Sequence, residues 1–199
     1  MSNVNGNKPF CIIISGLPSS GKTHLAIKLS KGLGIYLLNS DFVREKFCDS
    51  MQDHFDNVVL STMNAVNQEN KERCMILCAS RTSFIFDGNS LDYEVYASLL
   101  KLLDHFDYER INIRIKSSEE KCEENYSKRK IGGMFVDRDV IGDNVFFTPA
   151  LPWKIRNQDV SDDNFQYIIE NYGSIEEYDD NTKELIEQIK KARSKQNER

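Results

Sequence analysis

The chain contains 199 residues, of which 40% are hydrophobic and 29% are charged, as in an ordinary globular protein. Its formal net charge of -5 excludes a protein that is basic overall, so nucleic acid is not favoured as a partner, although a local basic groove would be compatible with this charge. The sequence has no apolar run long enough to span a membrane and no signal-peptide pattern, so we expect a cytoplasmic protein. We interpret the five cysteines as reduced and structural, which agrees with that compartment.

The first predicted elements enclose a glycine-rich segment. Residues 10–15 are apolar and rich in isoleucine, so they predict a buried strand. Residues 23–33 carry apolar side chains at helical spacing, which predicts a helix. Between them lies Gly16-Leu17-Pro18-Ser19-Ser20-Gly21-Lys22-Thr23, which matches the pattern G-x-x-x-x-G-K-T of a phosphate-binding loop.

This motif assigns a task to each part of the loop. Backbone N–H groups and the positive end of the helix dipole should face the phosphates, and the two glycines let the backbone approach them closely. Lys22 is expected to reach the β- and γ-phosphates and to take part in catalysis, and Thr23 is expected to hold Mg²⁺. We predict that this loop binds ATP through Gly16, Pro18, Ser19, Ser20, Gly21, Lys22 and Thr23.

A short second strand is predicted at 35–38, and polar residues follow it. Because ligands bind outside the carboxyl ends of strands in open α/β sheets, Asp41 should lie at the same edge of the sheet as the phosphate loop. Ser40 or Asp41 is expected to cap the helix that begins here. Arg44 lies about one helical turn beyond Asp41 and should face the same cleft.

The remaining elements continue to alternate along the chain. The pattern predicts, in order, helical sequence at 51–79 with a break at 67–70, a strand at 83–86 that ends in Asp87, a helix at 93–103, a strand at 111–115, a helix from a capping box at 117–120 to residue 130, an irregular stretch at 134–163, a strand at 165–169, and a helix that opens with a capping box at 174–177 and frays at 190–199.

Strands that alternate with helices throughout predict an α/β fold with a five-stranded, mainly parallel sheet and helices on both faces. We predict one domain over residues 1–199, with a lid and an irregular excursion at about 129–164.

Several classes of protein share a phosphate loop, and the sequence helps to separate them. Motor and regulatory ATPases usually carry an Asp-Glu pair at the end of a buried strand, whereas Asp87 is followed by Gly88. A GTPase needs an N-K-x-D motif, which the sequence lacks, and the D-x-x-G at 139–142 lies in irregular sequence. A kinase needs a carboxylate that orients and deprotonates the acceptor hydroxyl, and Asp41 is placed for this task.

The segments at 16–23, 39–44 and 86–89 resemble the small P-loop kinases related to polynucleotide 5′-hydroxyl kinase, adenylylsulfate kinase, gluconate kinase and zeta-toxin sugar-nucleotide kinases. The resemblance implies a three-layer sandwich of the P-loop NTPase type. Its D-x-x-R motif implies that Asp41 is the catalytic base and that Arg44 grips the substrate.

The resemblance implies further site residues. It implies a lid arginine over the phosphates, for which Arg129 is the best match and Arg138 is the second candidate. Arg138 is also assigned as a substrate contact. The segment 168–174 looks like the loop beside adenine in related nucleotide and dephospho-coenzyme-A kinases, which implies nucleotide contacts by Asn171 and Gly173. We expect Thr23 and Asp87 to be the metal ligands, and we also assign Asp87 as a substrate contact.

The sequence therefore predicts an ATP-dependent kinase that uses ATP and Mg²⁺ and transfers the γ-phosphate to a hydroxyl of a small molecule or of a nucleotide or polynucleotide end. The alternative is a P-loop ATPase that acts as a regulatory or switch protein without a phosphoryl acceptor. An acceptor should stimulate ATP turnover by a kinase, whereas a protein partner or self-assembly should stimulate a switch. The oligomeric state stays open.

Overall fold

The computed structural model describes residues 8–17, 19–44, 46, 60–88, 93–127 and 162–197. Pro18, Arg129, Arg138 and nearly all of the predicted lid at 129–164 lie outside these residues. The backbone of the helix Ser40–Arg44 is described, but the side chains of Asp41 and Arg44 are not.

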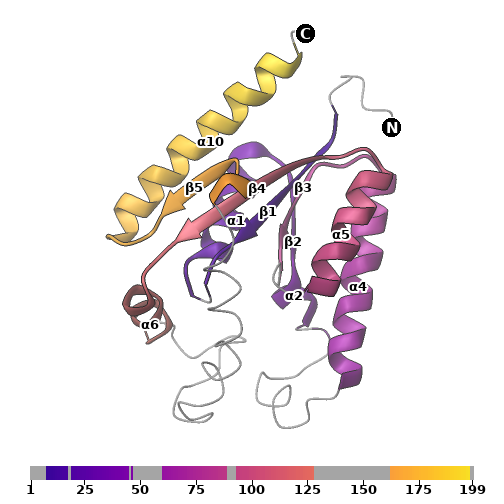
Figure 1. The fold of residues 1–199 in the computed structure, drawn as a ribbon, viewed down its shortest axis with the longest axis horizontal. Coiled ribbons are helices and arrows are strands. Elements are labelled where there is room, and N and C mark those ends of the chain that lie inside the picture. The colour runs from indigo at the N-terminus through magenta and orange to yellow at the C-terminus, as the bar shows by residue number, and fades with distance from the viewer. Residues whose placement is uncertain are drawn as a thin grey trace.

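The centre of the fold is a five-stranded sheet in the order β2-β3-β1-β4-β5 (Figure 1). Its strands are β1 (Phe10–Ser15), β2 (Tyr36–Asn39), β3 (Phe84–Asp87), β4 (Glu109–Lys116) and β5 (Tyr167–Glu170). Every neighbouring pair is parallel, so the predicted parallel α/β sheet is confirmed. In such a sheet the carboxyl ends of β1, β2 and β3 share one edge, and the loops that follow them meet there.

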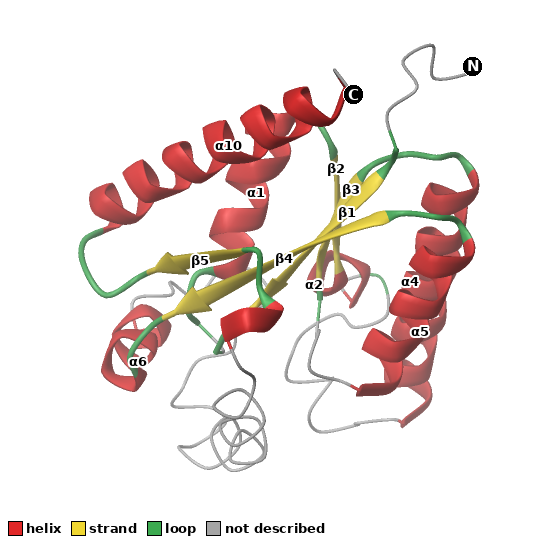
Figure 2. Cartoon of the chain, turned by 45° about the horizontal axis from the view of Figure 1, so that its top comes forward, coloured by secondary structure: helices red, strands yellow, loops and turns green. Residues whose placement is uncertain are grey.

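Helices cover both faces of this sheet (Figure 2). Helices α1 (Lys22–Leu33) and α10 (Ile175–Asn197) pack together on one face, and α4 (Leu60–Ala79) and α5 (Tyr93–His105) pack together on the other. The short helix α2 (Ser40–Arg44) follows β2 directly, and α6 (Glu119–Ser127) follows β4. A single 3₁₀ turn, Asp162–Asn164, precedes β5. This is the predicted three-layer arrangement.

The two faces of β1 belong to different halves of the core. Ile12 and Ile14 pack with the residues of α1 and α10, whereas Cys11 and Ile13 pack with those of α4 and α5. Because side chains alternate along a strand, a strand that is covered on both faces must be apolar throughout. This explains why residues 10–14 form an uninterrupted apolar run.

The cysteines of the described residues are buried and form no disulfide bond: Cys11, Cys74, Cys78 and Cys122. Burial raises the pKa of Cys74 to about 12 and that of Cys78 to about 11, so both thiols stay protonated near neutral pH. A protonated, buried thiol is a poor nucleophile and a poor metal ligand. Within the described parts of the chain, no group of three or more His, Cys, Asp and Glu side chains could hold a metal ion.

The helical sequence at 67–70 does not break, because α4 runs without interruption from Leu60 to Ala79. The polar side chains of this segment find partners instead of ending the helix. Glu69 accepts hydrogen bonds from Lys46 at 2.9 Å and from Arg73 at 2.8 Å, and Asn70 turns inward to Ser40. The predicted break is therefore wrong.

The charged end of the last helix is also better ordered than its composition suggests. Helix α10 continues to Asn197, and Arg193 reaches back to the start of the sheet. The Arg193 guanidinium pairs with Glu109 and lies 4.5 Å from the centre of the Phe10 ring. These contacts fix residues up to 197 in a helix, so the prediction that the tail frays from residue 190 is wrong.

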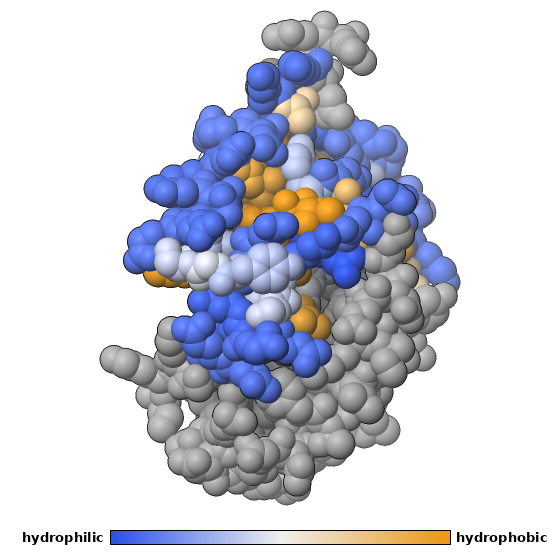
Figure 3. All heavy atoms as spheres, turned by 60° about the vertical axis from the view of Figure 1, so that its left-hand side comes forward, coloured by the Kyte–Doolittle hydropathy of each residue, from blue (hydrophilic) through white to orange (hydrophobic). Residues whose placement is uncertain are grey.

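The face that carries β5 and α10 is mostly hydrophilic, with patches of apolar surface between the charged side chains (Figure 3). Strand β5 lies at the edge of the sheet, and 41% of its Ile168 is exposed. None of the described helices is both long enough and apolar enough to cross a membrane.

Candidate active site

The loop between β1 and α1 folds back on itself at the carboxyl edge of the sheet. Ser19 and Gly21 adopt positive φ angles of 60° and 98°, and the N–H of Ser20 donates to the carbonyl oxygen of Leu17 at 3.1 Å. Successive residues of this kind form a concave row of backbone N–H groups that suits an anion. Gly21 directly precedes the first residue of α1, so the positive end of this helix adds to the same field.

Side chains from elsewhere in the chain hold the carbonyl groups of this loop. The amide of Asn125 donates to the carbonyl oxygen of Ser19 at 3.1 Å, and the amide of Asn171 donates to that of Ser20 at 2.9 Å. We call Asn125, Asn171 and Tyr178 the carbonyl clamp, because the hydroxyl of Tyr178 likewise donates to the carbonyl oxygen of Gly21 at 3.3 Å. These three bonds hold the carbonyl groups of Ser19, Ser20 and Gly21 and so fix the backbone of the loop.

Gly21 is the residue that this clamp requires. A Cβ atom at this position would lie 3.0 Å from the amide nitrogen of Asn171 and 3.1 Å from the Tyr178 ring, and its φ angle of 98° disfavours any other residue. The glycine therefore lets the clamp close on the loop, in addition to the ligand approach that the motif predicts.

Each member of the clamp is fixed by its own element. Asn171 follows β5, and its N–H donates to the carbonyl oxygen of Lys116 at the end of β4. Ser117 donates its hydroxyl to the carbonyl oxygen of Asn171 at 2.9 Å. Asn171 is 6% exposed, so its amide is desolvated as well as oriented. Burial also raises the pKa of the Tyr178 phenol, which keeps its proton available for donation to Gly21.

Serine caps set the positions of the helices that carry the other two clamp residues. The hydroxyl of Ser174 accepts the N–H of Glu177 at 3.2 Å at the start of α10, as the predicted capping box requires. For α6 the cap is Ser118, whose hydroxyl accepts the N–H of Lys121 at 3.1 Å. The N-cap of α6 is therefore Ser118, and because the third helical residue is then Lys121, the predicted S-x-x-E box at 117–120 is wrong.

The Lys22 side chain folds back onto the start of the loop. Its ammonium group donates to the carbonyl oxygens of Gly16 at 2.9 Å and Leu17 at 2.7 Å. An ammonium group beside a concave row of N–H groups gives a donor set that fits the phosphates of a nucleotide. Thr23 follows in the first turn of α1, and both its hydroxyl and the carboxylate of Asp87 are oxygen groups of the type that Mg²⁺ prefers.

Helix α1 is tied to α10 next to the loop. The imidazole Nε2 of His24 lies 2.6 Å from the Oδ1 atom of Asp179, and the Lys28 ammonium pairs with the same carboxylate. Hydrogen bonds from Lys28 and then from His24 lower the pKa of Asp179, which therefore stays ionised near neutral pH. The neighbouring Tyr178 and Asp179 thus bind the loop and its helix respectively.

A second polar group lies at the same edge, where β2 and β3 end side by side. Asn39 and Asp87 are register partners, and the Asn39 amide donates to the Oδ2 atom of Asp87 at 2.6 Å. The Oδ1 atom of Asn39 accepts the N–H of Phe42 at 2.9 Å, so Asn39 is the N-cap of α2. The prediction that Ser40 or Asp41 caps this helix is therefore wrong.

This geometry frees Asp41 from a capping role. Its backbone occupies the second position of α2, directly after the polar edge formed by Asn39 and Asp87. Asp87 is 5% exposed, so its carboxylate is almost fully enclosed at the end of β3. Whether Asp41 and Arg44 contact a substrate is not tested by the described side chains, and their predicted roles remain predictions.

The structure thus brings together some of the predicted site residues. Gly16, Ser19, Ser20, Gly21 and Lys22 form one loop, and Asn171 joins it through Ser20. Gly173 lies in the turn two residues further on, and its predicted nucleotide contact stays a prediction. Asn39, Asn125 and Tyr178 were missed by sequence reasoning, because no motif links residues so far apart.

A phosphate loop at the carboxyl edge of a five-stranded parallel sheet, with helices on both faces, defines the P-loop NTPase fold. The model of the AAA domain family matches residues 11–143, which is more than half of the chain, and the chain belongs to this family. The predicted P-loop fold is confirmed, and solved kinases of the same fold agree with the predicted resemblance to small P-loop kinases. No curated protein matches the sequence.

Solved structures of kinases share this fold. The APS kinase CysC of Mycobacterium tuberculosis, in complex with AMPPNP and APS, has 15% identity and a TM-score of 0.54, over 92% of this chain and 99% of that one. Shikimate kinase of Bacteroides thetaiotaomicron has 11% identity and a TM-score of 0.57, over 91% and 98% respectively. A gluconokinase of Sinorhizobium meliloti has 13% identity and a TM-score of 0.52, over 92% and 97%. At such identities the likeness shows the fold.

Proposed function

We propose that this chain is an ATP-dependent kinase that transfers the γ-phosphate of ATP to a hydroxyl group of a small molecule. The observation that carries the proposal is the clamped phosphate loop, whose first carbonyl oxygens hold the Lys22 ammonium. Fixed donors of this kind stabilise the charge of a transferring phosphoryl group without having to reorganise. The solved kinases of the same fold support the assignment.

In the proposed reaction the residues of this chain divide the work. The loop from Gly16 to Thr23 binds the phosphates of ATP, and Lys22 neutralises the charge on the β- and γ-phosphates. Asp41 accepts the proton of the acceptor hydroxyl, and Arg44 holds the acceptor. Arg129 is proposed as the lid arginine, with Arg138 as the second candidate. Asn171 and Gly173 are proposed to lie beside the adenine.

The metal site is proposed from the same edge of the sheet. Thr23 and Asp87 would hold Mg²⁺, which would supply positive charge to offset that of the transferring phosphoryl group. The Asn39 amide fixes one carboxylate oxygen of Asp87 at 2.6 Å, which orients the carboxylate as outer partners of metal ligands do.

A regulatory ATPase without a phosphoryl acceptor is the second candidate. The phosphate loop supports it equally, because both functions need the same phosphate site. The carboxylate placed directly after β2 favours the kinase, since a switch protein has no acceptor hydroxyl to deprotonate. A cytoplasmic location and a polynucleotide end as acceptor remain predictions from the sequence alone.

One experiment tests the proposal directly. The full chain is incubated with ATP labelled in the γ-phosphate, Mg²⁺, and separate pools of metabolites, sugar nucleotides and short 5′-hydroxyl oligonucleotides. A kinase should label one pool, and Lys22→Ala should abolish this labelling. Lys31→Ala, which changes an exposed lysine in the last turn of the same helix, should leave labelling intact. ATP hydrolysis that no pool stimulates and a protein partner accelerates would favour the regulatory ATPase.

A further inference from the structure

Helix α2 is too short to hold its own position. It has five residues, Ser40–Arg44, whereas isolated helices of fewer than about 12 residues are marginal in water. Its orientation must therefore come from the elements that pack against it. Because Asp41 and Arg44 both belong to α2, whatever fixes this helix also fixes the two residues that are proposed to handle the acceptor.

One tie to α2 comes from Asn70, in the middle of α4. The amide of Asn70 donates to the Oγ atom of Ser40 at 3.2 Å, and the two residues are only 3% and 8% exposed. Ser40 is the first residue of α2 and directly precedes Asp41. The residue after β3 encloses the same hydroxyl, since a Cβ atom at Gly88 would lie 2.5 Å from Ser40 Oγ. The start of α2 is thus held between α4 and the end of β3.

Two further contacts join α2 to the same part of α4. The two helices pack together, and the buried Val43 of α2 and Val66 of α4 belong to one apolar cluster. Lys46 lies two residues after α2, and its ammonium group pairs with Glu69 at 2.9 Å. Glu69 directly precedes Asn70, so one short stretch of α4 contacts α2 at its start, along its length and just beyond its end.

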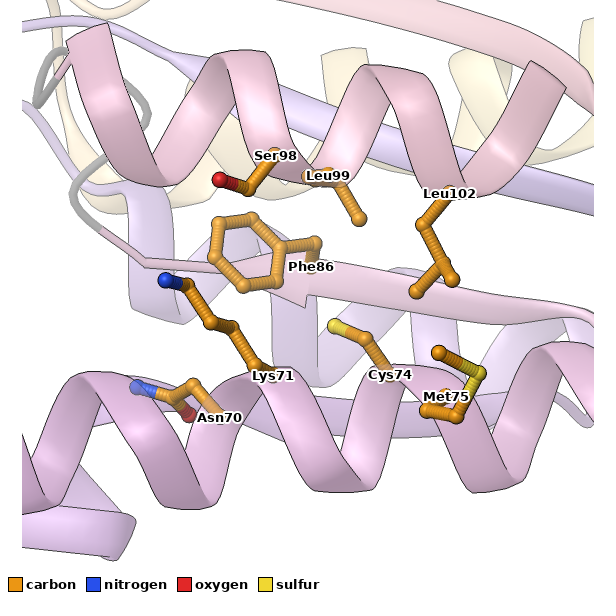
Figure 4. A pocket seen from close by; sticks show the side chains of 8 residues that line it. All are labelled: Asn70, Lys71, Cys74, Met75, Phe86, Ser98, Leu99 and Leu102. Carbon is orange, nitrogen blue, oxygen red and sulfur yellow. The ribbon is translucent and has the colours of Figure 1, made fainter. Parts of the chain in front are cut away.

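Asn70 occupies a position on α4 that otherwise carries apolar or weakly polar side chains. The buried stripe of this helix, with members four residues apart, consists of Val66, Asn70, Cys74 and Cys78. In Figure 4 the sulfur of Cys74 is directed toward the space between α4 and α5, whereas the Asn70 amide does not point toward α5. The amide therefore serves the contact with α2 and not the groove between α4 and α5.

This amide is unfavourable for the stability of the core. The Oδ1 atom of Asn70 is buried and has no hydrogen-bond partner among the described residues. A buried polar atom without a partner costs stability, so an apolar side chain would suit this position better if stability were its only task. Departures of this kind are expected at sites that serve function. What Asn70 supplies in return is the bond to Ser40.

We propose that Asn70 is a positioning residue, which holds α2 through Ser40 in the orientation that phosphoryl transfer requires. The proposal rests on the proposed kinase function, because that function assigns Asp41 and Arg44 of α2 to the acceptor. Asn70 acts only through Ser40 and the backbone of α2.

Hydrogen exchange of the full chain tests the tie without any acceptor. Asn70→Leu removes the amide and keeps a buried, branched side chain, so it should retain the stability of the wild type in urea denaturation. Exchange over residues 39–46 should nevertheless become about fivefold faster, which is the effect of a typical hydrogen bond on an opening equilibrium. Exchange over residues 22–33 of α1 should not change. Asn70→Ala, which removes the same amide without adding volume, should also accelerate exchange over 39–46.

Two results of this measurement would overturn the proposal. One is unchanged exchange over residues 39–46 in both folded variants. The other is an equal acceleration over 39–46 and over α1, because that would indicate a general role of Asn70 in stability.

The matched control is Cys74→Ala, one turn further along the same buried stripe. It truncates a buried side chain and should lower the stability. Exchange over residues 39–46 should change no more than exchange over α1, since Cys74 is directed toward α5. If Cys74→Ala accelerates exchange over 39–46 as selectively as Asn70→Leu does, the bond to Ser40 is not the cause.

Ser40→Ala tests whether this bond carries the effect. It leaves the buried Asn70 amide without its acceptor, so it should lose more stability than Asn70→Leu. In the Ser40→Ala background, Asn70→Leu should not accelerate exchange over residues 39–46 any further, because the tie is already lost. Fully additive acceleration would show that Asn70 acts by another route and would refute the proposal.

The catalytic consequence is measured with γ-labelled ATP and whichever of the metabolite, sugar-nucleotide and oligonucleotide pools the wild type labels. Asn70→Leu should lower kcat by up to roughly 100-fold, the effect of displacing a reacting group by about an ångström. The KM for ATP should not change, because the phosphate loop is untouched. A loss of stability alone would not lower the turnover of the folded enzyme.

Full turnover in Asn70→Leu with accelerated exchange over residues 39–46 would refute the positioning role. If the wild type labels no pool, the kinase function fails, and the catalytic role of Asn70 fails with it. The exchange data would in that case still show whether Asn70 holds α2, so the two failures can be told apart.

Discussion

Asn171 and Ser20 are 151 residues apart in the chain, and the Asn171 amide donates to the Ser20 carbonyl oxygen at 2.9 Å in a buried hydrogen bond. The turn after β5 thereby determines the shape of the loop after β1. The phosphate site consequently depends on residues that its own motif does not contain.

Asn171→Ala should weaken ATP binding and stability together. The variant leaves the buried Ser20 carbonyl without a donor, at a cost of about 1–3 kcal/mol, and lets the loop relax. Thr182→Val is the matched control, because it removes a buried hydrogen bond from Thr182 to the Tyr178 carbonyl oxygen of α10 without touching the loop. Calorimetry and urea denaturation should show both variants destabilised and only Asn171→Ala impaired in ATP affinity. Equal ATP affinities in the two variants would contradict a role of the clamp in binding.

Asp41→Asn should abolish turnover and preserve the fold. Asn39 caps α2, so the substitution leaves the cap in place. Loss of a positioned base costs roughly 10²–10⁴-fold in rate. Kinetics with the acceptor identified by labelling should show this fall in kcat, with little change in ATP affinity or melting temperature. If Asp41→Asn keeps near-full turnover, the base lies elsewhere, and Asp87→Asn becomes the next variant to measure.

A pair of substitutions at Asn39 separates its two contacts. Asn39→Ser keeps a capping oxygen but is too short to hold the Asp87 carboxylate, whereas Asn39→Ala removes both contacts. The alanine variant should therefore be less stable than the serine variant by about 1 kcal/mol, the typical value of an N-cap. Urea denaturation measures this difference. Identical midpoints for the two variants would show that the cap of α2 contributes nothing to stability.

The tie between α1 and α10 predicts a dependence on pH. Lys28 and His24 lower the pKa of Asp179 below its ordinary value of 3.8, so the unfolded chain takes up a proton first as the pH falls. The stabilisation by Asp179 is thus present above pH 3.8 and is lost below it. Asp179→Asn should lower stability at pH 7, and its difference from the wild type should shrink below pH 3.8.

The control for this pH dependence is Asp180→Asn. The carboxylate of Asp180 pairs with Lys183 one turn along the same helix, and both side chains are more than 70% exposed. Its substitution should change stability little at either pH, because exposed pairs contribute little. A constant difference between wild type and Asp179→Asn across this range of pH would show that the ion pair is not the cause.

The parallel fold was predictable because its signals are local. Strand β1 was placed at 10–15 with its observed bounds, since a strand covered on both faces needs a continuous apolar run. The break expected at 67–70 was wrong because a run of polar residues can find partners on another element, as Asn70 does on α2. The tail of α10 was misjudged for the same reason, since Arg193 is held by Glu109, which lies 84 residues earlier.

In the candidate site, too, the parts with local signals were predicted and the contacts between distant residues were missed. The motif from Gly16 to Thr23 indicates the phosphate loop by itself, because the spacing of its residues is local. The clamp was missed because Asn125 and Tyr178 act over 106 and 157 residues, and neither belongs to a motif. Asn39 was overlooked as a cap because Ser40 and Asp41, which follow it, are also residue types that favour this position.

The carbonyl clamp also bears on protein synthesis. A chain that is still attached to the ribosome at residue 165 has already released the complete G-x-x-x-x-G-K-T segment. It lacks both Asn171 and Tyr178, so the carbonyls of Ser20 and Gly21 have no side chain to hold them. Nucleotide capture would then begin only when the last strand and helix have emerged. Early binding of ATP, which stabilises any state that binds it, would be unable to assist the folding of the first half of the sheet.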